Sequence, residues 1–145
     1  MSQRIDIGKI DPEAYKHIIA LNTHVQNTST DPLLNELIKI RASQINGCAF
    51  CINMHTQDAR AKGETEQRIY ALSAWRDATY FTEKERAVLA LTEAVTLVST
   101  ERVHDDVYEA AAKVLTPEEL ANTILAIAVI NVWNRLSIST GLQAR

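Results

Sequence analysis

The sequence predicts an all-α protein of about seven helices. Apolar residues recur at intervals of three and four, and no segment shows the alternation of a half-buried strand. Only four glycines and three prolines occur in 145 residues, so few positions interrupt a helix. A chain of this length is expected to form a single domain, residues 1–145. We expect helices at residues 12–27, 32–46, 49–62, 65–73, 83–99, 105–114 and 117–140.

Capping signals mark where these helices begin and end. In three places a residue that can cap a helix precedes a proline at the first helical position: Asp11-Pro12, Asp31-Pro32 and Thr116-Pro117. Two starts have the spacing of a capping box, with a glutamate three residues after a threonine: Thr82 with Glu85, and Thr116 with Glu119. Glycines stand where helices are expected to end, at Gly47, Gly63 and Gly141.

The apolar surface of the predicted helices suggests how they pack. Arg41 interrupts the apolar stripe of residues 32–46, and its burial would require an acidic partner such as Glu36 or Glu93. The helix at 117–140 is apolar on most sides, which is difficult to bury in a small lone domain. We therefore expect a subunit interface there, and the alternative is a central helix wrapped by the other six.

Composition and charge exclude several classes of partner. The net charge is −3 and the 15 basic residues are scattered, which argues against binding to nucleic acid. No stretch reaches the roughly 18 uninterrupted apolar residues of a membrane span, and the first residues, Met-Ser-Gln-Arg-Ile-Asp, lack the apolar run of a signal peptide. We expect a cytoplasmic protein with no membrane partner.

Cys48, Cys51 and His55 are the residues most indicative of chemistry. Gly47 ends one predicted helix and the next begins near Cys48, so spacings of three and four place the three side chains on one helix face. A Cys-x-x-Cys pair at a helix start can close into a disulfide with little backbone change, and the helix N-terminus stabilises its thiolates. In a reducing compartment, such a pair is more often catalytic or metal-binding than structural.

The spacing also suggests an order for the two cysteines. His55 follows Cys51 by one helical turn and can act there as a base or as an imidazolium partner. This favours Cys51 as the attacking thiolate and Cys48 as the resolving thiol, whereas analogy with thioredoxin would favour the first cysteine.

Other uses of the pair remain open. Buried cysteines can simply be small core residues, and a pair can serve as a redox sensor. Cys-x-x-Cys-x-x-x-His also offers three zinc ligands, one short of a closed structural site. A fourth ligand would have to come from another histidine: His17, His24 or His104.

The run Ser-Gln-Ile-Asn-Gly-Cys-x-x-Cys-x-x-x-His, from Ser43 to His55 and followed by Ala59, resembles the core motif of the alkyl hydroperoxidase D-like (AhpD-like) proteins. These belong to the carboxymuconolactone decarboxylase-like superfamily. Their motif has a glutamate twelve residues before the first cysteine, and the matching residue here is Glu36. Residues 130–136 are similar to the closing helix of small single-domain members, so the resemblance covers roughly residues 12–140.

This resemblance implies an AhpD-like helical fold and a peroxidase of peroxiredoxin type, acting on hydrogen peroxide or organic hydroperoxides. Glu36 and His55 would form a proton relay, with Cys51 as the peroxide-reactive thiol and Cys48 as the resolver. A thioredoxin-like or lipoyl dithiol would restore the reduced pair, with no bound cofactor or metal. The family also implies a homo-oligomer, and for a single-domain chain this short we expect a hexamer in preference to a trimer.

Two features depart from the simplest form of this expectation. The best-known peroxidase of the family has a second histidine directly before its second cysteine, where this chain has Phe50, so the relay would lack one member. Glu36 lies at the margin of its apolar stripe and could be a solvated carboxylate. A decarboxylase of the same superfamily is the alternative enzyme, but its members generally lack the cysteine pair.

Overall fold

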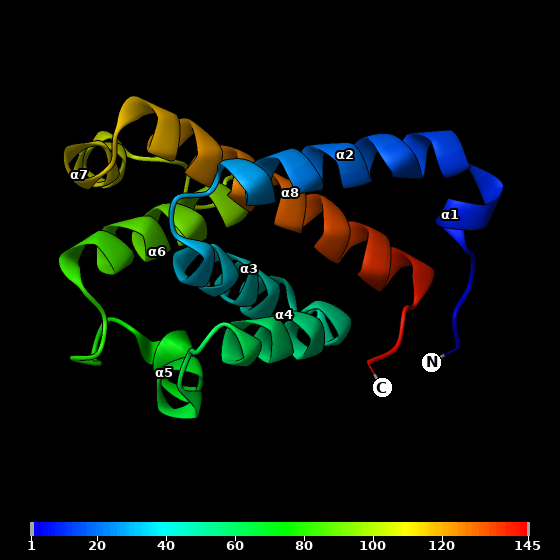
Figure 1. Ribbon diagram of the computed structural model, residues 1–145, viewed down its shortest axis with the longest axis horizontal. Helices are drawn as coiled ribbons and strands as arrows, with labels where there is room; N and C mark the ends of the chain where they lie inside the picture. Colours follow the sequence, from blue (N-terminus) through cyan, green and yellow to red (C-terminus); the bar gives the residue numbers. More distant parts are fainter. Residues whose placement is uncertain (1, 145) are drawn as a thin grey trace.

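The computed structural model describes residues 2–144. The described chain contains helices and no strand, which confirms the predicted all-α class (Figure 1). In chain order the helices are α1 (Ile7–Ile10), α2 (Pro12–Thr28), α3 (Pro32–Asn46), α4 (Ala49–Ala61), α5 (Glu66–Ala71), the 3-10 helix η1 (Leu72–Ala74), α6 (Glu83–Thr96), α7 (Asp105–Val114) and α8 (Pro117–Thr140).

The predicted capping residues begin these helices. Asp11 and Asp31 each accept a hydrogen bond from a backbone N–H of the first turn, at 3.0 Å in both cases. Thr82 and Thr116 form complete capping boxes with the glutamates three residues later. Because a cap satisfies N–H groups that the helix leaves unpaired, the starting points of α2, α3, α6 and α8 follow from short-range chemistry.

The differences from prediction are confined to short or frayed segments. The single-turn helix α1 is an addition to the predicted set, because four residues are too few to show a period. The segment 65–73 divides into α5 and η1, and the helix predicted for 83–99 ends at Thr96. There the Thr100 hydroxyl and N–H both bond to the Leu97 carbonyl, at 3.2 and 2.9 Å, and this local turn replaces the last helical turn.

The central helix is α3, which contacts α4, α6 and α8 (Figure 1). Nine of its fifteen residues are buried. One apolar cluster lies where α3 meets α6, α7 and α8, and a second where it meets α4, α5 and α6. The alternative of a central helix at 117–140 is therefore wrong: the most covered position belongs to α3.

Arg41 pairs with Glu93, one of the two acidic partners that the sequence suggested. Its Nε donates to Glu93 Oε1 over 2.9 Å, and Trp75 Nε1 donates to the same oxygen over 2.8 Å. Burial raises the pKa of Glu93, but hydrogen bonds from Trp75, Arg76 and Arg41 outweigh it and leave the pKa below its ordinary value. The arginine is thereby paired as burial requires.

The long helix α8 is only partly covered by the rest of the described chain. It contacts α2, α3, α4, α6 and α7, while Leu125, Val132 and Ile138 are between 38% and 45% exposed. By length and composition α8 could also cross a membrane, but core helices of soluble proteins pass the same test, and 44% of its most apolar window is buried here. One side of α8 thus completes the core and the other presents apolar side chains.

Candidate active site

A tight connection between α3 and α4 places the cysteine pair. Gly47 ends α3 with a φ of 70°, a left-handed conformation that glycine adopts without steric cost. The Cys48 N–H then returns to the Ser43 carbonyl over 3.0 Å. Cys48 becomes the N-cap of α4, with its sulfur 3.4 Å from the Cys51 N–H nitrogen. The chain reverses within two residues, so α4 runs back alongside α3.

Cys48 and Cys51 form a disulfide with their Cα atoms 5.4 Å apart. Each cysteine is 1% exposed, and the pair belongs to an apolar cluster with Ala42 and Ile130, against which Phe50 packs. The geometry confirms a Cys-x-x-Cys pair at a helix start whose two sulfurs are close enough to form a disulfide.

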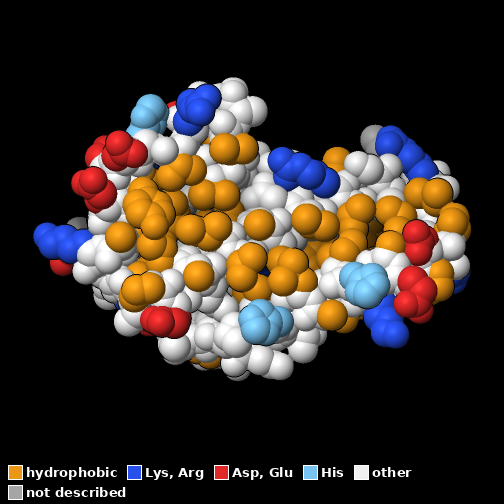
Figure 2. Space-filling view, turned by 90° about the horizontal axis from the view of Figure 1, so that it is seen from above, with side chains coloured by type: hydrophobic (Ala, Val, Ile, Leu, Met, Phe, Trp, Pro, Cys, Tyr) orange, Lys and Arg blue, Asp and Glu red, His pale blue; other side chains and the backbone are white. Residues whose placement is uncertain are grey.

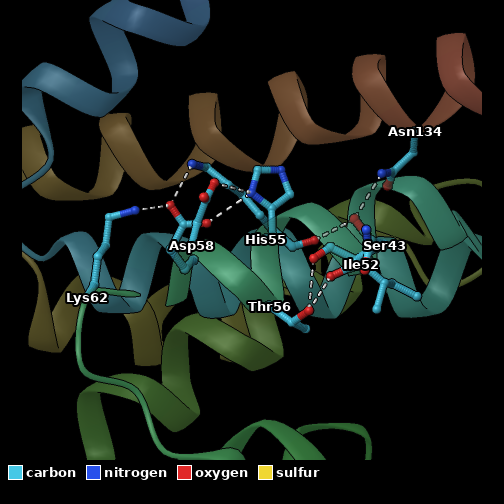
Figure 3. Close-up of polar contacts among 10 residues, drawn as sticks. Ser43, Ile52, His55, Thr56, Asp58, Lys62 and Asn134 are labelled. Atoms are coloured by element: carbon cyan, nitrogen blue, oxygen red, sulfur yellow. Dashed lines mark hydrogen bonds and ion pairs between the residues drawn. The ribbon is translucent and has the colours of Figure 1, made fainter. Parts of the chain in front are cut away.

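Glu36 and His55 meet between α3 and α4. His55 Nδ1 lies 2.9 Å from Glu36 Oε2, and both side chains are buried. A carboxylate that accepts from Nδ1 fixes the proton there and leaves Nε2 as the basic nitrogen, an assignment that rests on the hydrogen-bond pattern. In Figure 3 the His55 ring lies over α4, with Lys62 and Asp58 on one side and Ser43 on the other.

Two lysines neutralise the second oxygen of Glu36. Its Oε1 accepts from Lys39 Nζ over 3.1 Å and from Lys62 Nζ over 2.9 Å. Burial raises the pKa of Glu36, but the His55 hydrogen bond and the two lysines outweigh it and lower the pKa to about 2. The suggestion of a solvated carboxylate is wrong, because Glu36 is 2% exposed. It is a buried, ionised group that orients His55.

Sequence reasoning missed both lysines. Lys39 is one turn after Glu36 on the same helix, a spacing at which opposite charges meet, so a local signal existed. It is 4% exposed, which is unusual for lysine. Lys62 follows α4 and is 26 residues from Glu36; no pattern along the chain connects the two.

A buried amide network ties the cysteine turn to α8. Asn46 Nδ2 donates to Asn131 Oδ1 over 3.0 Å and to Asn134 Oδ1 over 2.9 Å. Asn134 Nδ2 donates to Ser43 Oγ over 2.9 Å, and Ser43 Oγ donates to the Lys39 carbonyl; Figure 3 shows this contact between Ser43 and Asn134. The network fixes the last turn of α3, directly before Cys48, against the closing helix.

The alternative of a zinc site finds no fourth ligand beside the cysteines. Among residues 2–144, the one group of three or more candidate metal ligands is Glu36, His55 and Asp58, which includes neither cysteine. Asp58 is half exposed and lies 3.9 Å from His55 Nδ1. Because two lysine ammonium groups already contact Glu36, the arrangement favours an ion-pair cluster over a metal centre.

The chain is similar to known proteins along most of its length. The model of the carboxymuconolactone decarboxylase family matches residues 12–94. The uncharacterised protein YdfG of Bacillus subtilis is 44% identical over 144 residues, 99% of this chain and 98% of YdfG. A solved structure, ATU0492 from Agrobacterium tumefaciens, is 39% identical with a TM-score of 0.96, covering 99% of each chain. It is a protein of unknown function, suggested to be the antioxidant defence protein AhpD.

A more distant structure shares the fold alone. An uncharacterised peroxidase-related protein from Silicibacter is 19% identical, with a TM-score of 0.81 over 93% of this chain and 72% of its own. The family match, the near-complete alignment with ATU0492 and the cysteine pair at the start of α4 agree with one another. The chain is thus an AhpD-like member of the carboxymuconolactone decarboxylase family.

Proposed function

We propose that this protein is a dithiol peroxidase that reduces hydrogen peroxide or an organic hydroperoxide through Cys48 and Cys51. The observation that carries the proposal is that the disulfide-forming pair at the start of α4 shares this helix with His55, whose ring is hydrogen-bonded to the buried Glu36 of α3. A nucleophile, a base and a group that orients the base are the parts such a reaction needs. The family's decarboxylases do not account for the pair.

The first half of the cycle uses Cys51 and His55. In the reduced protein, His55 Nε2 takes the proton of the Cys51 thiol. The thiolate attacks one peroxide oxygen and the O–O bond breaks, so that sulfur loses two electrons and becomes a sulfenic acid. The leaving alkoxide or hydroxide takes the proton that His55 holds. Glu36 stays ionised throughout, because its pKa is about 2, and stabilises the imidazolium that forms in between.

The second half uses Cys48. Its sulfur attacks the Cys51 sulfenic acid, water leaves and the disulfide closes, which protects Cys51 from further oxidation. A partner dithiol, thioredoxin-like or lipoyl, then supplies two electrons and two protons. We place the cycle in the cytoplasm, where such reductants keep thiols reduced. The relay proposed here has two members, since Phe50 stands where the best-known family peroxidase has a histidine.

Intact-protein mass spectrometry tests the proposal. The reduced protein is mixed with one equivalent of ethyl hydroperoxide and sampled from seconds to minutes. We expect a rapid loss of two hydrogens, as the dithiol becomes a disulfide, with one equivalent of alcohol released. No mass change within minutes would refute peroxidase function. A single oxidation that no thioredoxin-like or lipoyl dithiol reverses would indicate a sensor instead.

We also propose that the protein is a homo-oligomer, with a hexamer as the expected state. Along α8 the exposed residues follow a spacing of four and three, the pattern of a helix-packing seam: Ala121, Leu125, Ala128, Val132, Arg135 and Ser139. Neighbouring α2 buries only Val25. Figure 2, which looks down on the face formed by α2, α7 and α8, shows a band of apolar side chains across it.

Light scattering coupled to size exclusion tests this interface. We expect several subunits for the wild type, and dissociation when Leu125 and Val132 are both changed to Glu, because two charges in an apolar seam cannot be paired. Tyr70→Glu is the control, since Tyr70 is 73% exposed and lies on α5, away from this face. If the wild-type protein has the mass of a monomer, the proposed oligomer is wrong.

A further inference from the structure

A serine of α8 reaches the sulfur of Cys51. Ser137, from the last turns of α8, places its Oγ 3.7 Å from Cys51 Sγ, and the serine is 7% exposed. A disulfide sulfur has no proton to give, so only the hydroxyl can donate in this contact. In the reduced protein the same hydroxyl would face the thiol or thiolate of Cys51.

The direction of this hydroxyl sets it apart from others on the helices. Serine and threonine in a helix commonly donate to the carbonyl one turn earlier. Five side chains do so here at 2.7 to 2.8 Å: Thr28, Ser43, Thr56, Thr92 and Thr140. Ser137 is also a hydroxyl residue within a helix, but its hydroxyl contacts the Cys51 sulfur. A buried hydroxyl directed at a redox-active atom is placed to act on that atom.

Ser137 also lines a hollow beside the cysteine site. The hollow has a volume of about 70 Å³ and lies between residues 3–8 and α8, with Ile5, Ile7, Tyr15, Trp133 and Leu142 among its walls. Trp133 stacks edge-on against Tyr15 and packs against the cysteine cluster. Two of the residues that line the hollow, Ser137 and Trp133, therefore also contact the cysteine site.

The N-terminal segment that borders this hollow is held against the end of α8. The Arg4 N–H donates to the Thr140 carbonyl over 2.7 Å, and its guanidinium donates to the Ser139 carbonyl over 3.2 Å. Gly141 allows the close approach: a Cβ there would lie 2.8 Å from the Ser2 carbonyl oxygen. The volume is less than half of the roughly 150 Å³ that accommodates benzene in an engineered cavity, so the hollow suits hydrogen peroxide or a short alkyl hydroperoxide.

We propose that this hollow is the peroxide entrance and that Ser137, which lines it, donates a hydrogen bond to the Cys51 sulfur. The inference rests on the proposed function in taking Cys51 as the attacking atom. The hydrogen bond favours the thiolate over the thiol, since it is stronger to a charged acceptor. During the attack on the O–O bond, the hydroxyl holds the sulfur toward the hollow while His55 returns the proton to the leaving oxygen.

The first test measures the thiolate directly, in a Cys48→Ser background so that only Cys51 reacts. We expect Ser137→Ala to move the midpoint of the iodoacetamide–pH profile upward by about one pH unit, and to slow the peroxide reaction at pH 7 about tenfold, as one lost charge-assisted hydrogen bond implies. Ser73→Ala, at an exposed serine of the 3-10 helix η1, should change neither quantity. An unchanged profile in Ser137→Ala would overturn the role of this residue.

This experiment distinguishes a failure of the proposed peroxidase function from a failure of the proposed role of Ser137. If peroxide oxidises Cys51 normally and Ser137→Ala alters nothing, the dithiol peroxidase stands and the role of Ser137 falls. If peroxide does not react but the alkylation profile still shifts with Ser137→Ala, the hydrogen bond is supported and the peroxidase function falls.

The second test narrows the entrance. A Cβ at Gly8 would lie 3.6 Å from the Tyr15 ring, in ordinary contact, so Gly8→Leu extends into the hollow without backbone strain. We expect it to slow oxidation by ethyl hydroperoxide at least tenfold and oxidation by hydrogen peroxide less. Equal rates for wild type and variant with both peroxides would place the entrance elsewhere. Thermal melting verifies that the variant is folded.

Discussion

Cys51→Ser is expected to abolish the reaction with hydroperoxide, whereas Cys48→Ser is expected to preserve the first step and stop the cycle there. Without Cys51 no sulfur lies one turn before His55, and without Cys48 no thiol can expel water from the sulfenic acid. Intact-mass analysis should therefore show a one-oxygen adduct, trapped by dimedone, in Cys48→Ser. It should show no adduct in Cys51→Ser, which corresponds to a loss of at least roughly a thousandfold in rate.

Both cysteines have neighbouring groups that can stabilise a thiolate, so the outcome is informative. Cys48 Sγ lies 3.4 Å from the Cys51 N–H nitrogen at the start of α4, the backbone contact that would favour the first cysteine. Cys51 has the Ser137 hydroxyl and the helical spacing to His55. We expect His55 to determine which cysteine attacks first, because the reaction with peroxide requires a base that accepts and returns a proton. Dimedone trapped on Cys48 in Cys51→Ser would reverse the order.

What the sequence could predict is what short-range chemistry determines. Helix starts at Pro12, Pro32 and Pro117 follow from a capping side chain and a proline. The turn at Gly47 follows from a residue that tolerates positive φ. The position of Cys48 and Cys51 at the start of α4 follows from these local features, and so the amino-acid sequence suffices to place the pair there.

What the sequence could not predict depends on contacts between distant segments. Glu36 is buried because α4 returns over it, and it stays ionised because His55, Lys39 and Lys62 contact it, of which Lys62 lies 26 residues on. Asn134 fixes Ser43 from 91 residues away, and Ser137 reaches Cys51 from 86. In each of these pairs the two residues are too far apart in the sequence for a helical spacing to connect them. Only the packing of one helix against another brings them together.

Glu36→Gln is expected to lower the free energy of unfolding at pH 7 by about 3 kcal/mol, because it leaves the buried Lys39 ammonium without a carboxylate. The substitution keeps the shape of the side chain and removes its charge. The same change deprives His55 of the group that orients it, so we expect the peroxide reaction to slow by about a hundredfold or more. Urea unfolding and stopped-flow oxidation measure the two effects. Glu109→Gln, on an exposed carboxylate of α7, should leave both near wild type.

The pH dependence separates the charge of Glu36 from its shape. Its pKa is lowered from 4.5 to about 2 in the folded protein, so ionised Glu36 stabilises the fold above its unfolded pKa. That contribution, about 3 kcal/mol, is lost as the pH falls from near 4.5 towards 2.

A second carboxyl titrates in the same range. The pKa of Glu119 is lowered to about 2 by the Thr116 N–H and then by Lys84 and Thr30, so acid destabilises the wild type through both groups. The difference in unfolding free energy between wild type and Glu36→Gln isolates the buried carboxylate. It should be largest above about pH 5 and shrink towards zero near pH 2. A difference that stays constant with pH would mean that Glu36 supports the fold by packing, and the ionised orienter of His55 would have to be sought elsewhere.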